Sequence, residues 1–521
     1  MGMVALHRRI GSAFVVTSGQ YGDVHRFAQE QGISRQRVYH EAKQVTATLE
    51  GTRTRHEIDR WKNEAAQLRQ QVTHLQGQLA QAVVLDDDKQ AELACVGQAC
   101  GVTLSQCHTL LTVLLAKPLS VASLGRRTHA AGQHAGALLN VLDAYARPLV
   151  RDGAGDEIYV SAPVLMVVEQ ESLCWVCGRL SDDVSGASWA HEFRQLPNLE
   201  QLARDGGKGL AKGVALVNAE REAQQQETLV DQGDHFHALW TGGVGLRRAE
   251  RRVQQALAAA EAADQALAEC ARQGQKQTGP TARARCAWQR AEQAMDAWQQ
   301  TEHHWQQAKD ALLPITPEGE LNTRAQAEQR LAETLAQLPD NDFAKSKRTL
   351  QQTEMLNYLD RMNDRLAQLP FAAEVTQAAV QQETLRRRPE LLQGDHPRAA
   401  ALRGVMLLCA VVLGQAGEAG QAAVASVRDI LRRAYRASSL VECINSVLRM
   451  HQAQHRKLTQ ELIDLKRLYW NCHTFRTGRR RGTCPYERLG VPWPEDLRWW
   501  ELLKMTPEQL QERLSTAKKA A

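Results

Sequence analysis

The sequence contains no apolar run long enough to cross a membrane. Its longest continuous apolar stretch, residues 405–413, has nine residues, whereas a spanning helix needs about 20. No secretory signal segment is apparent, and the eleven cysteines are scattered without the spacing of a disulfide framework. Such cysteine usage is typical of a reducing compartment. We therefore expect a cytoplasmic protein with no membrane partner.

The chain also has little net charge, because the formal total is only +5. That charge is unevenly placed: residues 1–82 hold 11 Lys and Arg against 7 Asp and Glu, and residues 431–521 hold 18 against 9. The middle of the chain is therefore acidic. Basic ends around an acidic middle favour a polyanionic partner, although solvated helix faces would give the same totals.

Residues 1–46 are predicted to form a helix-turn-helix unit. Ala28, Gly32 and Val38 have its spacing: a small residue where two helices touch, a glycine at the turn and an apolar residue that fixes the second helix. Ser34 is a suitable N-cap for that helix. The side chains that a groove-reading helix would direct at DNA are Arg35, Gln36, Arg37 and Tyr39. An ordinary helical hairpin is the alternative.

Residues 47–87 carry a heptad pattern. Its apolar positions alternate in steps of three and four and are Ile58, Trp61, Ala65, Leu68, Val72, Leu75 and Leu79. Such a seam indicates a coiled coil and predicts a homodimer or a higher homo-oligomer, with helix packing inside one chain as the alternative.

Residues 88–150 are predicted to be helical. Their bend at residues 100–105 resembles a second helix-turn-helix, and a plain linker bundle is the alternative.

Residues 151–244 are the strand-rich part of an otherwise helical chain. Short runs of branched apolar residues alternate with turn residues, which predicts three hairpin-linked strands and then alternating helices and strands. The expected strands are residues 158–160, 164–168, 173–176, 202–205 and 235–240, and the expected helices are residues 188–195 and 208–224. The predicted fold class is mostly α with a mixed α/β core.

Two carboxylates stand out in this region. Asp156 is expected to open the first strand, and Asp205 is expected to end a later strand directly before Gly206 and Gly207. A carboxylate at a strand end beside a glycine turn can face a cleft. The pair therefore gives a first, weak indication of a divalent-metal site.

The cysteines and histidines of the same region carry less information. Cys174 and Cys177 form a lone CxxC, but residues three apart on a strand point to opposite faces, so packing is the better interpretation. His235 and His237 are expected on one strand face beside Asp234. They could be ligands, and polar residues at a strand end are the plainer account.

Residues 245–436 are rich in Ala, Gln, Glu and Arg, which predicts helix. Two apolar stripes separated by Gly279 and Pro280 predict an antiparallel helical hairpin. Residues 405–413 are expected to form the most buried helix of this part.

Residues 437–491 are the second informative stretch, and residues 492–521 are expected to be a tail. On a helix from Ser439, the residues Glu442, Asn445 and Arg449 share the polar face. They could meet a metal and a phosphate backbone together, or simply face solvent. A glycine-containing loop further on suits phosphate contact, with a solubilising basic tail as the alternative. Its basic residues are Arg476, Arg479, Arg480 and Arg481.

These pieces resemble a known family. An aspartate at the first of three strands, a second one before Gly-Gly and a glutamate in the segment SSLVECINSVLR are similar to the DDE transposases and integrases. The segment YWNCHTFRTGRRRGTCPYERLGV resembles the end of bacterial insertion-sequence transposases, with an Asn after an aromatic pair, a basic glycine loop and then Pro-Tyr-Glu. The resemblance covers about residues 155–240 and 437–491.

The resemblance implies a ribonuclease-H-like fold that holds two divalent ions, Mg²⁺ or Mn²⁺. In that arrangement Asp156 bridges both ions, with Asp205 on one and Glu442 on the other. The candidates for holding the DNA backbone are Lys208, Lys212, Asn445 and Arg449. The implied partner is double-stranded DNA, as transposon ends and target, and the implied location is the nucleoid.

One departure from the family pattern is the separation of 237 positions between Asp205 and Glu442, where compact members have far fewer. The helices of residues 245–436 are therefore expected to be an insertion that interrupts the α/β core. This gap leaves Asp429 and Glu461 open as the third acid. We predict a transposase that cleaves and transfers DNA strands. The alternatives are a transposase relic that binds DNA without cutting it and a helical scaffold with an incidental α/β domain.

Overall fold

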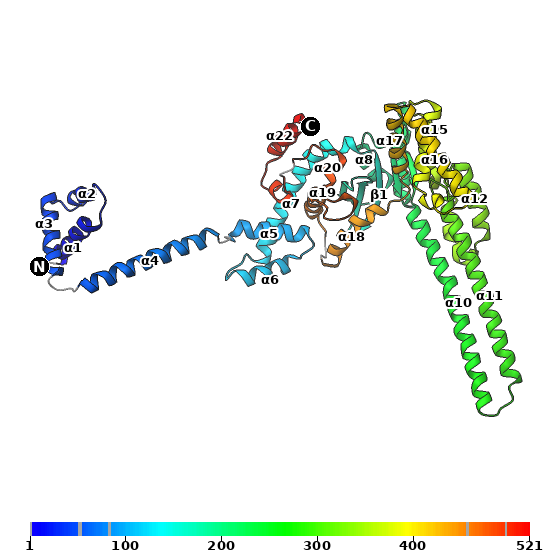
Figure 1. Cartoon of the computed structure of the whole chain (residues 1–521), viewed down its shortest axis with the longest axis horizontal. Coiled ribbons are helices and arrows are strands. Elements are labelled where there is room, and N and C mark those ends of the chain that lie inside the picture. Colours follow the sequence, from blue (N-terminus) through cyan, green and yellow to red (C-terminus); the bar gives the residue numbers. More distant parts are fainter. Residues whose placement is uncertain (1–2, 51–54, 82–84, 455–457, 495–496, 521) are drawn as a thin grey trace. The chain divides into compact units, whose positions relative to one another are not determined.

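The computed structural model describes residues 3–50, 55–81, 85–454, 458–494 and 497–520. It divides into two compact units, Met1–Leu85 and Asp86–Ala521 (Figure 1). The first unit contains helices alone among its described residues, and the second contains the sheet and the candidate site.

In the first unit, α1 (Met3–Ser18), α2 (Asp23–Glu30) and α3 (Arg35–Glu50) pack on one another. Ala28 and Val38 are 3% and 0% exposed, and Gly32 forms the turn between α2 and α3 with a φ of +62°. A left-handed turn of this kind favours glycine because it has no Cβ. The structure therefore agrees with the spacing on which the helix-turn-helix prediction depends.

The heptad segment forms α4 (Arg55–Gln81), a single helix of 27 residues. Trp61, Leu68, Val72 and Leu75 of its seam are each more than half exposed. The side chains of Ile58 and Leu79 lie outside the described residues. Self-association through this seam stays a prediction.

Five strands form one mixed sheet in the second unit: β1 (Asp152–Tyr159), β2 (Pro163–Glu169), β3 (Trp175–Leu180), β4 (Gln201–Arg204) and β5 (Val230–Gly233). Their order is β3-β2-β1-β4-β5, with β1, β2 and β3 joined as antiparallel hairpins and with β4 and β5 parallel to β1. The three hairpin-linked strands are confirmed. Residues 164–168 of β2 are buried throughout, which explains the continuous apolar run, because helices cover both faces.

One face of the sheet is covered by α7 (Val121–Ala146), α8 (Gly186–Arg194) and α9 (Lys208–Ala223), which bury Leu165 and Val167 of β2. The other face is covered by α18 (Ser439–Gln454), whose Val441, Ile444 and Leu448 pack on β1 and β2. Along the free side of β3 lies α19 (Gln460–Cys472).

Shorter helices complete this body. They are α5 (Asp87–Ala99), α6 (Leu104–Leu114), η1 (Arg147–Leu149), η4 (Gly478–Arg480), α20 (Pro485–Leu489), α21 (Trp499–Leu502) and α22 (Pro507–Ala520). Gly101 forms the bend between α5 and α6 with a φ of +96°. The segment that we expected to be a tail is part of the core, because Leu502, Leu510 and Leu514 are fully buried.

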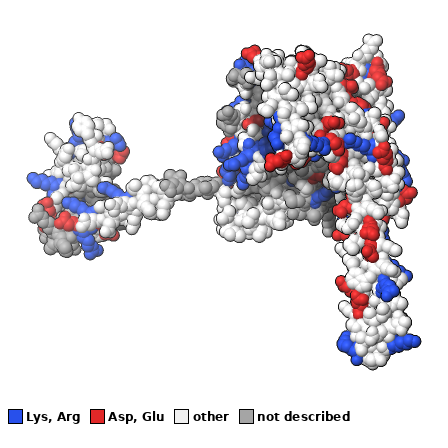
Figure 2. All heavy atoms as spheres, turned by 45° about the vertical axis from the view of Figure 1, so that its right-hand side comes forward, with Lys and Arg blue, Asp and Glu red and all other residues white. Residues whose placement is uncertain are grey.

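Between β5 and α18 the chain forms a helical part with a hydrophobic core of its own. It begins with a long antiparallel hairpin of α10 (His235–Arg272) and α11 (Thr278–Ala311) (Figure 1). The helices that follow are α12 (Arg324–Gln337), α13 (Asp340–Leu350), η2 (Thr353–Leu356), α14 (Asn357–Ala367), α15 (Ala373–Arg386), η3 (Pro389–Leu392), α16 (Pro397–Gln415) and α17 (Glu418–Arg432). Basic side chains gather at the free end of the hairpin (Figure 2).

The start of the first strand differs from the prediction. Asp156 does not open β1 but lies within it, since the strand begins at Asp152. Gly153 and Gly155 are strand residues beneath a leucine layer, although glycines at this spacing are typical of a turn. A Cβ on Gly153 would lie 3.1 Å from Leu199 Cδ1. The glycines are thus explained by the close approach of leucine side chains rather than by a bend.

Two further predictions are wrong. Residues 235–240 are not a strand but the first turns of α10. The hairpin turns at Gly274, where φ is +65°, and not at Gly279 and Pro280, which lie in the first turn of α11. Proline is tolerated there because the first N–H groups of a helix have no partner within the helix.

The helix expected to be the most buried one is exposed. Leu407, Leu408 and Val411 of α16 are 69%, 67% and 56% exposed. Among the described helices, α16 alone has the length and composition to cross a membrane, with a mean hydropathy of 1.6 over 18 residues. One such helix is weak evidence for a membrane span, and the absence of a membrane partner stays a prediction.

Candidate active site

Three neighbouring parallel strands, β1, β4 and β5, each lead to an aspartate at the same level of the sheet. The positions paired across these strands are Gly155 of β1, Arg204 of β4 and Gly233 of β5. The residue that follows each of these positions is an aspartate: Asp156 within β1, Asp205 just after β4 and Asp234 just after β5. Neighbouring strands lie about 4.8 Å apart, so the register of the sheet sets these residues in a line. We call this line the aspartate row.

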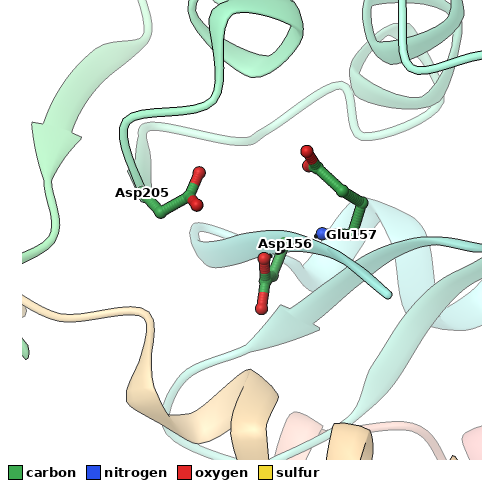
Figure 3. A group of neighbouring side chains, drawn as sticks. All are labelled: Asp156, Glu157 and Asp205. Atoms are coloured by element: carbon green, nitrogen blue, oxygen red, sulfur yellow. Dashed lines mark hydrogen bonds between the residues drawn. The ribbon is translucent and has the colours of Figure 1, made fainter. Parts of the chain in front are cut away.

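Asp156 and Asp205 form an acidic cluster with Glu157. One carboxylate oxygen of each residue lies within 4.8 Å of the others. Figure 3 shows the side chains of Asp156 and Glu157 on opposite sides of β1, with Asp205 approaching from the loop after β4. Backbone N–H groups hold two of the carboxylates: Asp156 Oδ1 accepts from Glu157 N at 2.9 Å and Asp205 Oδ1 accepts from Gly207 N at 2.8 Å.

Two acids of the cluster have raised pKa values. Burial, helped by the charge of Asp205, raises the pKa of Asp156 to about 6. Burial and the charges of Asp205 and Asp156 raise the pKa of Glu157 to about 7. Carboxylates that share a site disfavour one another's charged form, and such groups in a cleft are candidates for a functional site.

Helix α18 crosses the aspartate row from end to end. Ser438, directly before the helix, donates its backbone N–H to Asp234 Oδ1 at 3.1 Å, and Asn445 Nδ2 donates to Asp156 Oδ2 at 2.8 Å. Seven residues of helix rise by about 10 Å, which equals two strand spacings. The two hydrogen bonds therefore fix the helix across the row, with its start at β5 and its second turn at β1.

Glu442 lies between these two anchors. It follows Ser438 by four positions and precedes Asn445 by three, so the three residues share one helix face. Its charge contributes to the raised pKa of Asp156. Glu442 is not a member of the acidic cluster, and its carboxylate binds Arg449 Nη1 at 2.9 Å.

The other two acids considered for the third position are engaged elsewhere. Asp429 binds Arg432 at 2.9 Å and Arg433 at 3.0 Å at the end of α17. Glu461 lies 3.7 Å from His129 of α7. Of the three candidates, only Glu442 is held on a helix that contacts the aspartate row.

Asp234 joins the end of β5 to the helical part of residues 235–436. Its carboxylate caps α10 by accepting from Phe236 N at 2.8 Å, and the same oxygen accepts from Ser438 N. Next to it, His235 N donates to Arg436 O at 2.9 Å. The chain therefore leaves the sheet and returns to it at the same place, as expected for an insertion.

The two histidines have different roles from those expected on a strand. His235 is 2% exposed, and its Nε2 lies 2.6 Å from Met355 O. His237 is half-buried, and its Nδ1 lies 2.5 Å from Asp234 Oδ2. Cys174 and Cys177 are both buried in the core beneath the sheet, in agreement with a packing role.

The predicted DNA-binding residues fall into two groups around the site. Lys208 and Lys212 on α9 are exposed, and so is Arg449 on α18. The prediction for Asn445 is wrong: its side chain is 1% exposed and is spent on Asp156. Asn445 therefore positions the acid instead of touching a phosphate backbone.

The basic glycine loop lies at the other end of the sheet. Arg480 donates to the carbonyls of Gln170 and Glu171, in the turn between β2 and β3. That turn adjoins the start of β1, since Glu169 pairs with Gly153. Arg480 thus has a structural role, whereas the neighbouring Arg476, Arg479 and Arg481 are exposed.

In the first unit the predicted groove-reading side chains face outward. Arg35, Gln36, Arg37 and Tyr39 are all exposed on α3. Arg37 also binds Glu41 at 3.3 Å, so part of its charge is already paired.

Sequence reasoning missed Glu157. Adjacent strand residues point to opposite faces, which made Asp156 alone the natural choice. The sequence does carry a signal for Glu157. It directly follows Asp156, so one strand brings two acids to the site to which Asp205 also belongs. In the structure Glu157 Oε2 is buried and has no hydrogen-bond partner among the described residues.

The acidic cluster fits a divalent cation. Its donors are all carboxylate oxygens, the ligands that Mg²⁺ and Mn²⁺ prefer. A cation would also pair with the unpartnered Glu157 oxygen and offset the mutual repulsion that raises the pKa values of Asp156 and Glu157.

No protein-family model matches this sequence, and no curated protein or solved structure is significantly similar to it.

Proposed function

We propose that the protein is a DDE-type transposase that cleaves DNA phosphodiesters at transposon ends and transfers the strands. The proposed core is ribonuclease-H-like. Supporting it, three antiparallel strands are followed by two parallel ones, in the order β3-β2-β1-β4-β5. Two of the three proposed acids come from adjacent parallel strands, Asp156 within β1 and Asp205 after β4.

The observation that carries the proposal is the placement of α18. Its hydrogen bonds to Asp234 and Asp156 direct the face bearing Glu442 at the middle of the aspartate row. A helix that merely filled the surface of the sheet would not need polar anchors at both ends of the row. An acid that is remote in the sequence therefore lies on a helix that contacts the aspartate row, which supports Glu442 as the third acid.

The proposed roles follow from the contacts. Two divalent ions bound by Asp156, Asp205 and Glu442 would activate the attacking oxygen and stabilise the leaving oxygen. Asn445 and Glu157 N orient Asp156, and Gly207 N orients Asp205. Glu157 adds a fourth carboxylate to the site.

Binding of the DNA backbone is assigned to exposed cations on two helices that flank the sheet, Lys208 and Lys212 on α9 and Arg449 on α18. Arg449 would leave Glu442 when it meets a phosphate, because surface ion pairs of this kind are worth only about 0–1 kcal/mol.

The test is a nicking assay with the full chain on duplex DNA from the ends that flank its gene. We expect nicking with Mg²⁺ or Mn²⁺ and none with chelator. Asp156→Asn, Asp205→Asn and Glu442→Gln should each abolish nicking while end binding persists. Asp296→Asn, at an exposed position on α11, is the matched control. Nicking that survives in Asp156→Asn would refute the assignment.

A second candidate is a transposase relic that binds DNA ends without cutting them. The Glu442–Arg449 ion pair favours it, because it keeps the third acid out of the acidic cluster. In that case the wild-type protein would bind its ends and leave them intact at every Mg²⁺ and Mn²⁺ concentration.

A further inference from the structure

A carboxylate–imidazole pair stands at the β5 end of the aspartate row. Asp234 follows β5 as Asp205 follows β4, and β4 and β5 are paired up to these residues. His237, in the first turn of α10, places Nδ1 2.5 Å from Asp234 Oδ2. The pair is therefore adjacent to the acidic cluster but does not belong to it.

Asp234 is held as a fixed, ionised acceptor. It is 4% exposed, and its oxygens accept hydrogen bonds from Phe236 N, His237 N and Ser438 N. The hydrogen bond to His237 and these backbone N–H groups outweigh burial and lower the pKa of Asp234. A carboxylate in this setting orients the ring and favours its protonated form.

The surroundings of His237 are acidic. The charged groups that face it are Asp234 at its own helix end, Asp205 after β4 and Asp156 on β1. The hydrogen bond to Asp234 and these charges raise the pKa of His237, which favours the protonated form of the ring. With Nδ1 on Asp234, Nε2 is the remaining donor, and none of the described residues engages it.

Burial in a core does not account for His237, whose ring contact is with its neighbour Phe236 at 5.4 Å. Its side chain is 43% exposed. By contrast, His235 in the same helix has a structural role. It is buried, and its ring packs edge-on against Tyr358 with the ring centroids 5.3 Å apart. An oriented, half-exposed imidazolium beside acids is the arrangement of a proton donor.

We propose that His237 is the general acid of DNA strand cleavage and that Asp234 is its positioning residue; this rests on the function proposed above. Water adds to the phosphorus atom and the P–O3′ bond breaks. The water proton passes to solvent, and the proton on His237 Nε2 passes to the departing 3′ oxygen, which leaves as a 3′-hydroxyl. His237 is then reprotonated from solvent before the next cleavage.

The test compares two duplexes that carry the same end sequence. One has an ordinary phosphodiester at the cleaved position, and the other has sulfur in place of the bridging 3′ oxygen. A thiolate departs without a proton, so a missing general acid slows only the oxygen substrate. Both are assayed with Mn²⁺, which tolerates a sulfur leaving group.

We expect His237→Ala and His237→Gln to slow cleavage of the oxygen substrate by about 10²–10⁴-fold and to cleave the sulfur substrate within about threefold of wild type. Asp234→Asn should also slow cleavage of the oxygen substrate selectively, by a smaller factor. His303→Ala, at an exposed position on α11, should leave both rates unchanged.

Two results would overturn the proposal. Equal losses on the two substrates would assign His237 a structural role, and wild-type rates on both would assign it none. Failure of the wild-type protein to cleave either duplex would instead refute the proposed function, so the two failures are distinguishable.

Discussion

Asn445 donates a hydrogen bond to Asp156 at 2.8 Å, across 289 positions of sequence. Both side chains are buried, at 1% and 8% exposure. The contact ties the helix that carries Glu442 to the central strand of the sheet. It also opposes the rise in the pKa of Asp156 that burial and nearby acids cause.

Replacing Asn445 should weaken the site without dismantling it. Asn445→Ala removes the donor, and loss of a partner from a buried polar group costs about 1–3 kcal/mol. We expect that loss in the free energy of unfolding, and a rise of about 10–100-fold in the Mg²⁺ concentration needed for cleavage. Chemical denaturation and a Mg²⁺ titration measure the two effects. Cys443→Ala, on the exposed side of the same helix, should change neither.

The acidic cluster should make stability depend on pH. The pKa values of Asp156 and Glu157 are raised to about 6 and about 7, so the folded state holds protons that the unfolded state has released. Without divalent ions, their contribution to stability should be fully present below about pH 4 and should be lost as pH rises through about 6 and 7, with a fall on the order of 3 kcal/mol between pH 5 and 8. Melting curves between pH 5 and 8 measure this. The double variant Asp156→Asn, Glu157→Gln should flatten the profile, and an unchanged slope would contradict the acidic cluster as the origin of the pH dependence.

Divalent ions should reverse that loss. At pH 8, Mg²⁺ at about 100 times its dissociation constant should stabilise the protein by roughly 2.7 kcal/mol. Thermal melting with and without Mg²⁺ measures the shift. Asp205→Asn should remove the effect and Asp296→Asn should keep it. Equal Mg²⁺ stabilisation in both variants would place the ion elsewhere.

The insertion is fastened to the sheet by a buried arginine. Arg361 of α14 binds Asp152 at 2.5 Å and Glu200 at 2.8 Å, and Asp152 is 0% exposed. Arg361→Ala should lower the free energy of unfolding by about 3–5 kcal/mol, because it leaves a buried charge without its main partner. Arg330→Ala breaks only a surface pair with Glu318 at 3.5 Å and should cost less than about 1 kcal/mol. Denaturant titrations that gave similar costs would refute this ranking.

DNA binding by the first unit should depend on α3. Arg35→Ala should weaken end binding and reduce the slope of log affinity against log salt by about one. Fluorescence anisotropy at several salt concentrations measures both. Arg69→Ala, on α4 outside the helix-turn-helix, is the control. Identical slopes for the two variants would exclude α3 as the main contact.

Local patterns were enough to predict much of the sheet. β2 and β3 follow from apolar runs between turn residues, and α9 follows from a helical pattern after Gly207. Asp156 and Asp205 were found because they lie beside such runs. Each of these signals is contained in a few neighbouring residues.

Other features depend on contacts that are distant in sequence. β5 has the polar sequence VDQG, and its Gln232 is satisfied by Met355 O and Tyr358 N of the insertion. No local pattern reveals such a strand. The role of Asn445 was missed for the same reason, since its partner Asp156 lies on a different element.

The closure at Asp234 has a consequence for how this chain can change. Because Ser438 and Asp234 are one hydrogen bond apart, residues 235–437 form a loop that is already shut at its base. Changes in length within that loop should leave the distance from Glu442 to Asp156 unchanged, provided that Arg361, Arg433 and Met355 keep their contacts with the sheet. The 237 positions between the second and third acids then measure the size of an inserted module whose two ends meet at Asp234.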